Sequence, residues 1–469
     1  MIGRAAAAAA LLWMGAGQAL EQRACRYDVD VSPQVVLDVT VRCDAGVHDV
    51  RPLDRYSHGH LQISAAQRDA RGFTARYRVE LAALARDAAT LDAAVASGES
   101  ILAVASSWLL APLREARGPA TLEIRVTSAQ GTDFATAQPT VEGAFRIPQS
   151  ELAMAGYSAF GRFSRHRMRA PGYADSEPPA DYEVVMLDGP IELSEDELLE
   201  WIAHCVDAVT RFWHGFPAPG MKIFVLPRRG AEGVVFGRDM SGGGVSMVLV
   251  VGEKVSRAQL DDDWVLVHEL VHAGSPFVAG APWFTEGLAT YLEPLIRARY
   301  GLQSPRAMWT EFVSNMPRGA AVIEATGLMR GGFRGWYWGG GLLMLLADVE
   351  MRRASDGRVG LEDCLRSVRH RIGNYLRSVR LDEMVAACDD AVGGTVLADL
   401  VERHARSDAR VDLERLWQDL GVRLVDGELE VDGDARLAAV REAIVRGGPG
   451  PGGSRDARSG TTHTAPRVD

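Results

Sequence analysis

The 469-residue sequence contains almost no lysine, no excess of positive charge and no long apolar run beyond its first residues. Lysine occurs only as Lys222 and Lys254, so the basic residues are nearly all scattered arginines, and the formal net charge is −11. This acidic balance argues against nucleic acid or an anionic membrane surface as the main partner. Because a helix needs about 20 apolar residues to cross a bilayer, no stretch after the start of the chain predicts an integral membrane segment.

The first residues have the pattern of an export signal. Arg4 precedes a short alanine-rich apolar run that ends near Ala16, and small residues follow at positions 17 and 19. A run of about a dozen apolar residues is too short to span a bilayer. We therefore expect a signal peptide at 1–19, cleavage near Ala19, and a periplasmic or secreted protein. A short buried helix or an uncleaved anchor is the alternative.

The five cysteines do not have the spacing of a metal-binding cluster, and export would place them in an oxidising compartment. Cys25 and Cys43 share the parity of the apolar residues on two expected strands, so a disulfide between them is plausible. Cys364 and Cys388 lie on two successive expected helices and could form a second. Cys205 would then be an unpaired, buried thiol. Spacing alone does not fix this connectivity.

Hydrophobic periodicity divides the chain into a β-rich first part and a helical last part. Strict alternation at 37–43, 73–81 and 122–126 is typical of strands with one wet face, which predicts a β-sandwich-like N-terminal domain. A second unit begins with an expected strand at 181–187, and everything after 338 has helical periodicity. The helices expected there are at 342–353, 361–371, 381–391, 396–405 and 413–420.

The stretch at 264–272 contains His268 and His272 four residues apart, with Glu269 directly after the first histidine. On a helix this spacing places both imidazoles on one face, where they can bind one Zn²⁺ at about 2.0–2.1 Å. Glu269 is then free to accept a proton from water at the metal. The alternative is an amphipathic helix with its polar residues in solvent. However, apolar residues surround the histidines, and a helix that is apolar on nearly every face should be buried, where polar groups need partners.

A second helix expected after Pro282 carries Glu286 in its first turn, so that Glu286 can face the two histidines. His268-Glu-Leu-Val-His272 followed by Trp283-Phe-Thr-Glu286-Gly resembles the gluzincin metallopeptidases. The resemblance is greatest to the glycyl aminopeptidase family and more distant to the aminopeptidase N family. It implies that the two histidines and Glu286 bind one zinc ion and that Glu269 is the general base.

Two further stretches can be compared with the same families. Tyr337-Trp-Gly-Gly340 is similar to their Tyr-x-x-Gly helix, which implies that Tyr337 stabilises the oxyanion. The Gly-x-Met-Glu-Asn signature, which holds the free amino group of a substrate, is absent. A strand expected to be exposed follows the position of that signature and could pair with an extended substrate. The residues proposed to bind substrate there are Gly242, Gly243, Gly244 and Val245.

The resemblance implies an α+β multidomain fold with a β-sandwich-like N-terminal domain, a thermolysin-like zinc peptidase domain and a C-terminal α-helical region. The expected division is a signal peptide at 1–19, an N-terminal β domain at 20–148, a connecting segment at 149–180, the catalytic domain at 181–340, a helical domain at 341–446 and a disordered tail at 447–469.

The sequence therefore predicts an exported metallopeptidase with one Zn²⁺ per chain that hydrolyses peptide or protein substrates through zinc-activated water. Whether it is an aminopeptidase or an endopeptidase stays open. A catalytically silent scaffold that binds peptide or protein in the same cleft is one alternative. A zinc hydrolase that acts on a bond other than a peptide bond is another.

Overall fold

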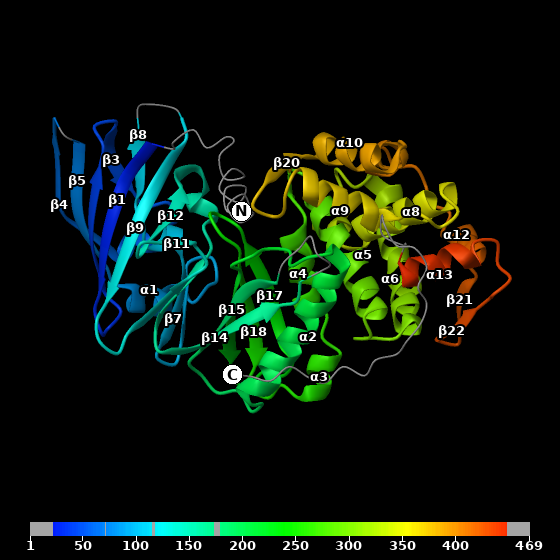
Figure 1. The fold of residues 1–469 in the computed structure, drawn as a ribbon, viewed down its shortest axis with the longest axis horizontal. Helices are drawn as coiled ribbons and strands as arrows, with labels where there is room; N and C mark the ends of the chain where they lie inside the picture. The colour runs from blue at the N-terminus through cyan, green and yellow to red at the C-terminus, as the bar shows by residue number, and fades with distance from the viewer. Residues whose placement is uncertain (1–21, 71, 115–117, 173–178, 448–469) are drawn as a thin grey trace, which may run out of the picture.

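The computed structural model describes residues 22–70, 72–114, 118–172 and 179–447. The expected signal peptide at 1–19 lies outside these residues, as does the expected tail after residue 447. Within the described residues, no helix is both long and apolar enough to cross a membrane. Figure 1 shows a group of sheets at the N-terminal side, a central sheet with its helices, and a group of helices beyond them.

The N-terminal part is a β-sandwich. Its elements are β1 (Gln22–Val31), β2 (Leu37–Cys43), β3 (Val47–Arg51), β4 (Leu61–Asp69), β5 (Gly72–Val79), α1 (Leu81–Ala88), β6 (Ala94–Ser97), β7 (Ser100–Val104), β8 (Ala111–Arg114), β9 (Ala120–Ser128), β10 (Asp133–Thr136), β11 (Thr140–Val141), β12 (Ala144–Pro148) and β13 (Tyr157–Gly161). A seven-stranded sheet has the order β11-β12-β9-β1-β2-β5-β4, and a four-stranded sheet has the order β10-β13-β7-β6. Side chains from both sheets, among them Tyr77 and Phe160, share one core. The predicted alternation appears as burial of every second residue of β2.

The central part is a five-stranded sheet of β14 (Phe163–Ala170), β15 (Ala180–Leu187), β16 (Lys222–Arg228), β17 (Val234–Met240) and β18 (Ser246–Gly252). The order is β14-β15-β16-β18-β17, with three parallel strands inside and an antiparallel strand at each edge. Helices α2 (Glu195–Trp213) and α4 (Val265–Gly274) pack on one face, and short α3 (Arg257–Asp261) precedes α4. Strands of the four-stranded sheet cover the other face. The central sheet thus packs directly against the N-terminal sandwich.

The segment 149–180, expected to connect two domains, contributes strands to both sheets. Strand β13 pairs with β7, and β14 pairs with β15. All five residues of β13 are buried, so this strand belongs to the core that joins the two parts.

The prediction of an exposed strand at 245–251 is wrong. Strand β18 lies between β16 and β17 and is buried along its whole length, because β17, which the sequence analysis left unassigned, takes the edge position.

The remaining chain is mostly helical. Its helices are α5 (Pro282–Arg299), α6 (Pro305–Thr326), α7 (Gly332–Trp336), α8 (Trp338–Ala354), α9 (Leu361–Arg371), α10 (Leu381–Val392), α11 (Val396–Leu400), α12 (Leu413–Leu420) and α13 (Ala438–Arg446). The predicted helices are present, whereas α6, α13 and the hairpin of β21 (Val422–Val425) and β22 (Glu428–Val431) were not predicted. A short parallel pair, β19 (Phe277–Ala279) with β20 (Ser378–Arg380), joins the segment after α4 to the segment after α9. The α+β fold class is confirmed.

Buried charges and disulfides fix these helices relative to one another. Arg352 of α8 is fully buried and donates to Glu362 of α9 at 2.6 and 2.7 Å, while Arg299 of α5 reaches the same carboxylate at 3.2 Å. The disulfide Cys364–Cys388 joins α9 to α10, and Cys25–Cys43 joins β1 to β2, so both predicted pairings are confirmed. The remaining cysteine, predicted to be an unpaired buried thiol, is buried and pairs with no other described cysteine.

Candidate metal site and its surroundings

Helix α4 presents His268 and His272 on one face, with their ring centroids 4.9 Å apart. The helix begins where the Asp263 carboxylate accepts the backbone N–H of Leu266 at 3.1 Å, and it ends at Gly274, where a Cβ would overlap the ring of a buried tryptophan. Both histidines are buried. The predicted helix and the shared face of its two histidines are therefore present.

Glu286 of α5 faces these histidines, and its Oε2 lies 3.3 Å from Nε2 of His268 and 3.6 Å from Nε2 of His272. The three possible ligand atoms all lie within 4.8 Å of one another. A tetrahedral ion with bonds of about 2.0–2.1 Å places its ligand atoms about 3.3–3.4 Å apart. Two imidazole nitrogens and one carboxylate oxygen are also the donor set that zinc takes when one coordination position is left open. The group fits a single zinc ion.

Glu269 lies where α4 packs against the edge strand β17, close enough to His272 and Glu286 for their charges to affect its pKa. A Cβ on Gly237 of that strand would lie 2.6 Å from Cγ1 of Val265 and 2.7 Å from Cγ of Glu269. Glycine therefore allows the helix and the strand to approach closely. The Glu269 carboxylate also accepts a hydrogen bond from the backbone N–H of Asp239. Burial, and to a lesser extent the nearby Asp239 carboxylate, raise the pKa of Glu269 to about 8.

Tyr337 lies at the junction of α7 and α8, beside the candidate ligands. Its ring stacks on His268 with centroids 6.1 Å apart, and its hydroxyl hydrogen-bonds to Glu286. Burial, with the Glu286 charge beside it, raises the pKa of Tyr337 to about 12, so the hydroxyl keeps its proton. Helices α5 and α8 come close together here because each has a glycine at the contact. A Cβ on Gly287 of α5 would overlap the backbone of Gly340 of α8.

The structure adds two residues that the sequence analysis missed. Asp239 of β17 lies near Glu269 and His272, and its Oδ2 is buried without a hydrogen-bond partner among the described residues. Tyr375, in the turn after α9, hydrogen-bonds to the Asp239 carboxylate, and its ring lies 6.5 Å from that of His272. Burial raises the pKa of Asp239 to about 6. The signal in the sequence is Gly237-Arg238-Asp239, an acid two residues after a glycine, which lies on the strand before β18.

The glycines proposed to bind substrate instead contact the N-terminal sandwich. The N–H of Gly242 donates to the carbonyl of Met154 at 3.0 Å, and the N–H of Gly243 donates to the Glu151 carboxylate at 2.7 Å. A Cβ on Gly244 would overlap a backbone carbonyl of that part. Their backbone groups and the space beside them are therefore occupied by the chain itself, and the following Val245 is buried. The open sheet edge that a substrate could use is β17.

The charges around the candidate ligands favour a bound cation. Burial would raise the pKa of Glu286, but hydrogen bonds from the two histidines hold that pKa well below its usual value. Burial would likewise lower the pKa of His272, yet its hydrogen bond to Glu286 and the neighbouring carboxylates raise that pKa to about 9. The carboxyl groups of Glu286, Glu269 and Asp239 thus lie near two imidazoles, and those of Glu286 and Asp239 are ionised at neutral pH. A dication held by His268, His272 and Glu286 would balance this negative charge.

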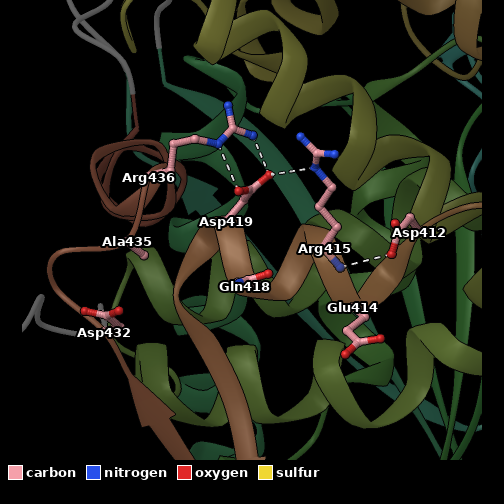
Figure 2. Close-up of a pocket in the computed structure, with 8 residues that line it drawn as sticks. All are labelled: Asp412, Glu414, Arg415, Gln418, Asp419, Asp432, Ala435 and Arg436. Atoms are coloured by element: carbon pink, nitrogen blue, oxygen red, sulfur yellow. Dashed lines mark hydrogen bonds and ion pairs between the residues drawn. The ribbon is translucent and has the colours of Figure 1, made fainter.

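A separate open hollow of about 620 Å³ lies on α12 and the residues before α13, away from these groups. Figure 2 shows the Asp419 carboxylate between the guanidinium groups of Arg436 and Arg415. Nε of Arg436 donates to Oδ1 of Asp419 at 2.9 Å, and Arg415 lies 3.8 Å from the same carboxylate. The charged groups of this hollow pair with one another at the surface. The hollow is therefore not a second candidate for a catalytic centre.

Structural comparison shows that the fold is similar to that of a solved aminopeptidase N family protein, which confirms the resemblance inferred from the sequence. An aminopeptidase N family protein from Idiomarina loihiensis superposes with a TM-score of 0.61 at 13% identity, over 85% of this chain and 78% of that one. An M1 zinc metallopeptidase from Deinococcus radiodurans gives a TM-score of 0.49 at 16% identity, over 82% and 94%. At these identities the likeness establishes the fold alone. No protein-family model and no curated protein matches the sequence.

Proposed function

We propose that this protein is a zinc-dependent aminopeptidase that removes single residues from the free amino end of peptides. The observation that carries the proposal is Asp239, an acid on the edge strand beside Glu269 and His272 with one buried, unpartnered carboxylate oxygen. With a pKa of about 6, this carboxylate is ionised at neutral pH, where most peptide α-amino groups still carry a proton. It can therefore bind the amino group of a substrate whose first peptide bond lies at the metal.

The chain would hold zinc through His268, His272 and Glu286. The bound ion would supply a Lewis acid and lower the pKa of water toward about 7. Glu269 is placed to accept a proton from the attacking water and to deliver it to the leaving amine. The Tyr337 hydroxyl, which keeps its proton, is placed to donate a hydrogen bond to the carbonyl oxygen as negative charge develops there.

The edge strand supports an extended substrate. In an antiparallel pair, the N–H and C=O groups of alternate residues point away from the neighbouring strand. The N–H of Asp239 points to Glu269 rather than to β18, so the groups of Gly237, two residues earlier, face the same open edge. They are available to the backbone of a peptide added to the sheet. This role replaces the one first assigned to the glycines before β18.

We also propose that the protein acts outside the cytoplasm. The two disulfides support an oxidising compartment, which agrees with the export signal expected at 1–19. Recovery of the mature chain from a periplasmic or secreted fraction, with its N-terminus determined by mass spectrometry, tests this part of the proposal.

The enzymatic proposal is tested with one peptide in two forms, with a free and with an acetylated amino end. We expect zinc-dependent release of the first residue from the free peptide and no cleavage of the acetylated one. Glu269→Gln is expected to keep one zinc per chain and lose turnover. Asp239→Asn is expected to raise KM for the free peptide far more than it changes zinc content.

Each contrary outcome has a distinct meaning. Internal cleavage of the acetylated peptide at a similar rate would make the protein an endopeptidase and remove the role of Asp239. Binding of either peptide without any cleavage by the zinc-loaded protein would favour the silent scaffold. Turnover that persists in Glu269→Gln would exclude Glu269 as the base.

A further inference from the structure

We infer that the enzyme prefers substrates whose second residue is aromatic or a large aliphatic, because an exposed aromatic arc lies where that side chain must pass. The arc is defined as Trp264, Tyr337 and Phe333. This inference rests on the proposed aminopeptidase function and adds to it the chemical class of substrate.

The arc is continuous with the metal site. The ring of Trp264 meets His268 edge-on with centroids 5.4 Å apart, and Tyr337 stacks on the same imidazole with centroids 6.1 Å apart. Phe333 extends the arc, with its ring 5.5 Å from that of Tyr337. These contacts place an aromatic wall at the His268 end of the candidate ligands.

Both outer rings of the arc are exposed. Trp264 is 49% exposed and Phe333 is 67% exposed, which is the largest exposed fraction of any large apolar side chain in the described residues. Exposed apolar rings gathered beside a catalytic-type centre are typical of ligand-binding surfaces. Phe333 stands on the five-residue helix α7, whose other apolar side chain, Trp336, packs against the core. Helix α7 therefore packs one aromatic ring, that of Trp336, against the core and leaves the other, that of Phe333, exposed to solvent.

The direction of the substrate follows from α4 and β17. Gly237 lies against Val265 near the start of α4, whereas Asp239 lies near Glu269 and His272, further along the helix. The amino group of a substrate bound by Asp239 is thus at the His272 end, which Tyr375 closes. The chain after the scissile bond must leave toward the start of α4. Trp264, the residue before α4, and the rest of the arc lie at this end.

A series of tripeptides tests the inference on the zinc-loaded protein. The peptides are Ala-Xaa-Ala with Phe, Leu, Ala, Asp or Lys as Xaa, so that the first residue and the free amino group stay constant. Because the arc covers only part of such a side chain, we expect kcat/KM for Phe and Leu to exceed that for Asp by about tenfold. Phe333→Ala should reduce this ratio toward one, and Phe333→Leu should retain much of it. Val431→Ala, which truncates an exposed apolar side chain on the remote strand β22, should leave the ratio unchanged.

Binding provides a second readout that does not require turnover. Calorimetric titration of the zinc-loaded Glu269→Gln protein should give a Kd about tenfold lower for Ala-Phe-Ala than for Ala-Asp-Ala, and Phe333→Ala in that background should remove the difference. Cleavage of all five tripeptides at equal rates, or an unchanged ratio in Phe333→Ala, would overturn the inference and leave the aminopeptidase function intact. Failure to cleave any tripeptide would instead contradict the proposed function, and equal binding constants would then overturn the inference as well.

Discussion

Replacing Gly237 with alanine should reduce catalysis without removing the metal. The added Cβ would lie 2.6 Å from Cγ1 of Val265 and 2.7 Å from Cγ of Glu269, whereas carbon atoms in contact are normally about 3.5–4.0 Å apart. Strand β17 and helix α4 must therefore separate locally by about 1 Å. A displacement of this size at a catalytic group costs about 100-fold in rate, which corresponds to about 2.7 kcal/mol of activation free energy. The atoms nearest to the added Cβ belong to Val265 and Glu269 and not to a candidate ligand, so zinc should remain bound.

The assay measures kcat/KM on a free tripeptide, zinc per chain by atomic absorption, and the free energy of unfolding in urea. We expect an approximately 100-fold loss of kcat/KM, one zinc per chain, and a loss of stability of about 1–3 kcal/mol from overpacking. Gly433→Ala is the matched control, because a Cβ at that position meets nothing within 4 Å. A folded Gly237→Ala protein with activity within threefold of the parent would refute the argument from close approach. Loss of zinc together with activity would show that the substitution acts on the ligands rather than on Glu269.

Three further predictions concern other supports of the fold and site. Tyr337→Phe should lower kcat by about 100-fold to 1000-fold with little change in KM or zinc content, as measured by steady-state kinetics; an unchanged kcat would exclude Tyr337 as an oxyanion donor. Burial would raise the pKa of Glu362, but two arginines lower it to about 2, so its contribution to stability is present above about pH 4.5 and is lost as pH falls toward 2. Glu362→Gln should therefore cost about 3–5 kcal/mol in urea unfolding at pH 7 and progressively less below pH 4.5; a cost that does not depend on pH would contradict this. Replacing Cys25 and Cys43 with serine opens a loop with a sequence separation of 18 and should lower the free energy of unfolding by about 3 kcal/mol, measured without reductant; a difference below 1 kcal/mol would argue against this contribution.

The helix that carries the two candidate histidine ligands could be predicted because its information is local. Two histidines four residues apart share a helix face whatever surrounds them, and Glu286 follows a proline that starts the next helix. Asp239 and Tyr375 could not be placed in this way. They lie about thirty and more than one hundred residues from His268, on a strand edge and in a turn, and only tertiary packing brings them together. The wrong prediction that β18 is exposed has the same origin. The order of the strands in the sheet, and not their order in the sequence, decides which strand is at the edge.

The omissions in the fold are of two kinds. The hairpin of β21 and β22 carries a local signal that was overlooked, since Asp426 and Gly427 between its strands both have positive φ, the conformation of a tight type I′ turn. Helix α6 buries Met308, Phe312, Met316 and Ile323, which are spaced as one helix face, but Pro317 within the same stretch argues against a continuous helix. Its structure depends on contact with the helices around it, including a point where Gly319 lies against the backbone of Trp338.

The groups of the proposed site are held by three separate sets of contacts, and this separation makes their roles testable one at a time. The candidate ligands are carried by α4 and α5. Glu269 depends on the edge strand, which the Arg238–Asp92 ion pair at 2.6 Å ties to the N-terminal sandwich. Tyr337 depends on the glycine contact between α5 and α8, and buried charges hold those same two helices to α9. A substitution in the second or third set should thus move one catalytic group while the metal stays bound. Activity and zinc content can then be uncoupled in variants that never touch a ligand.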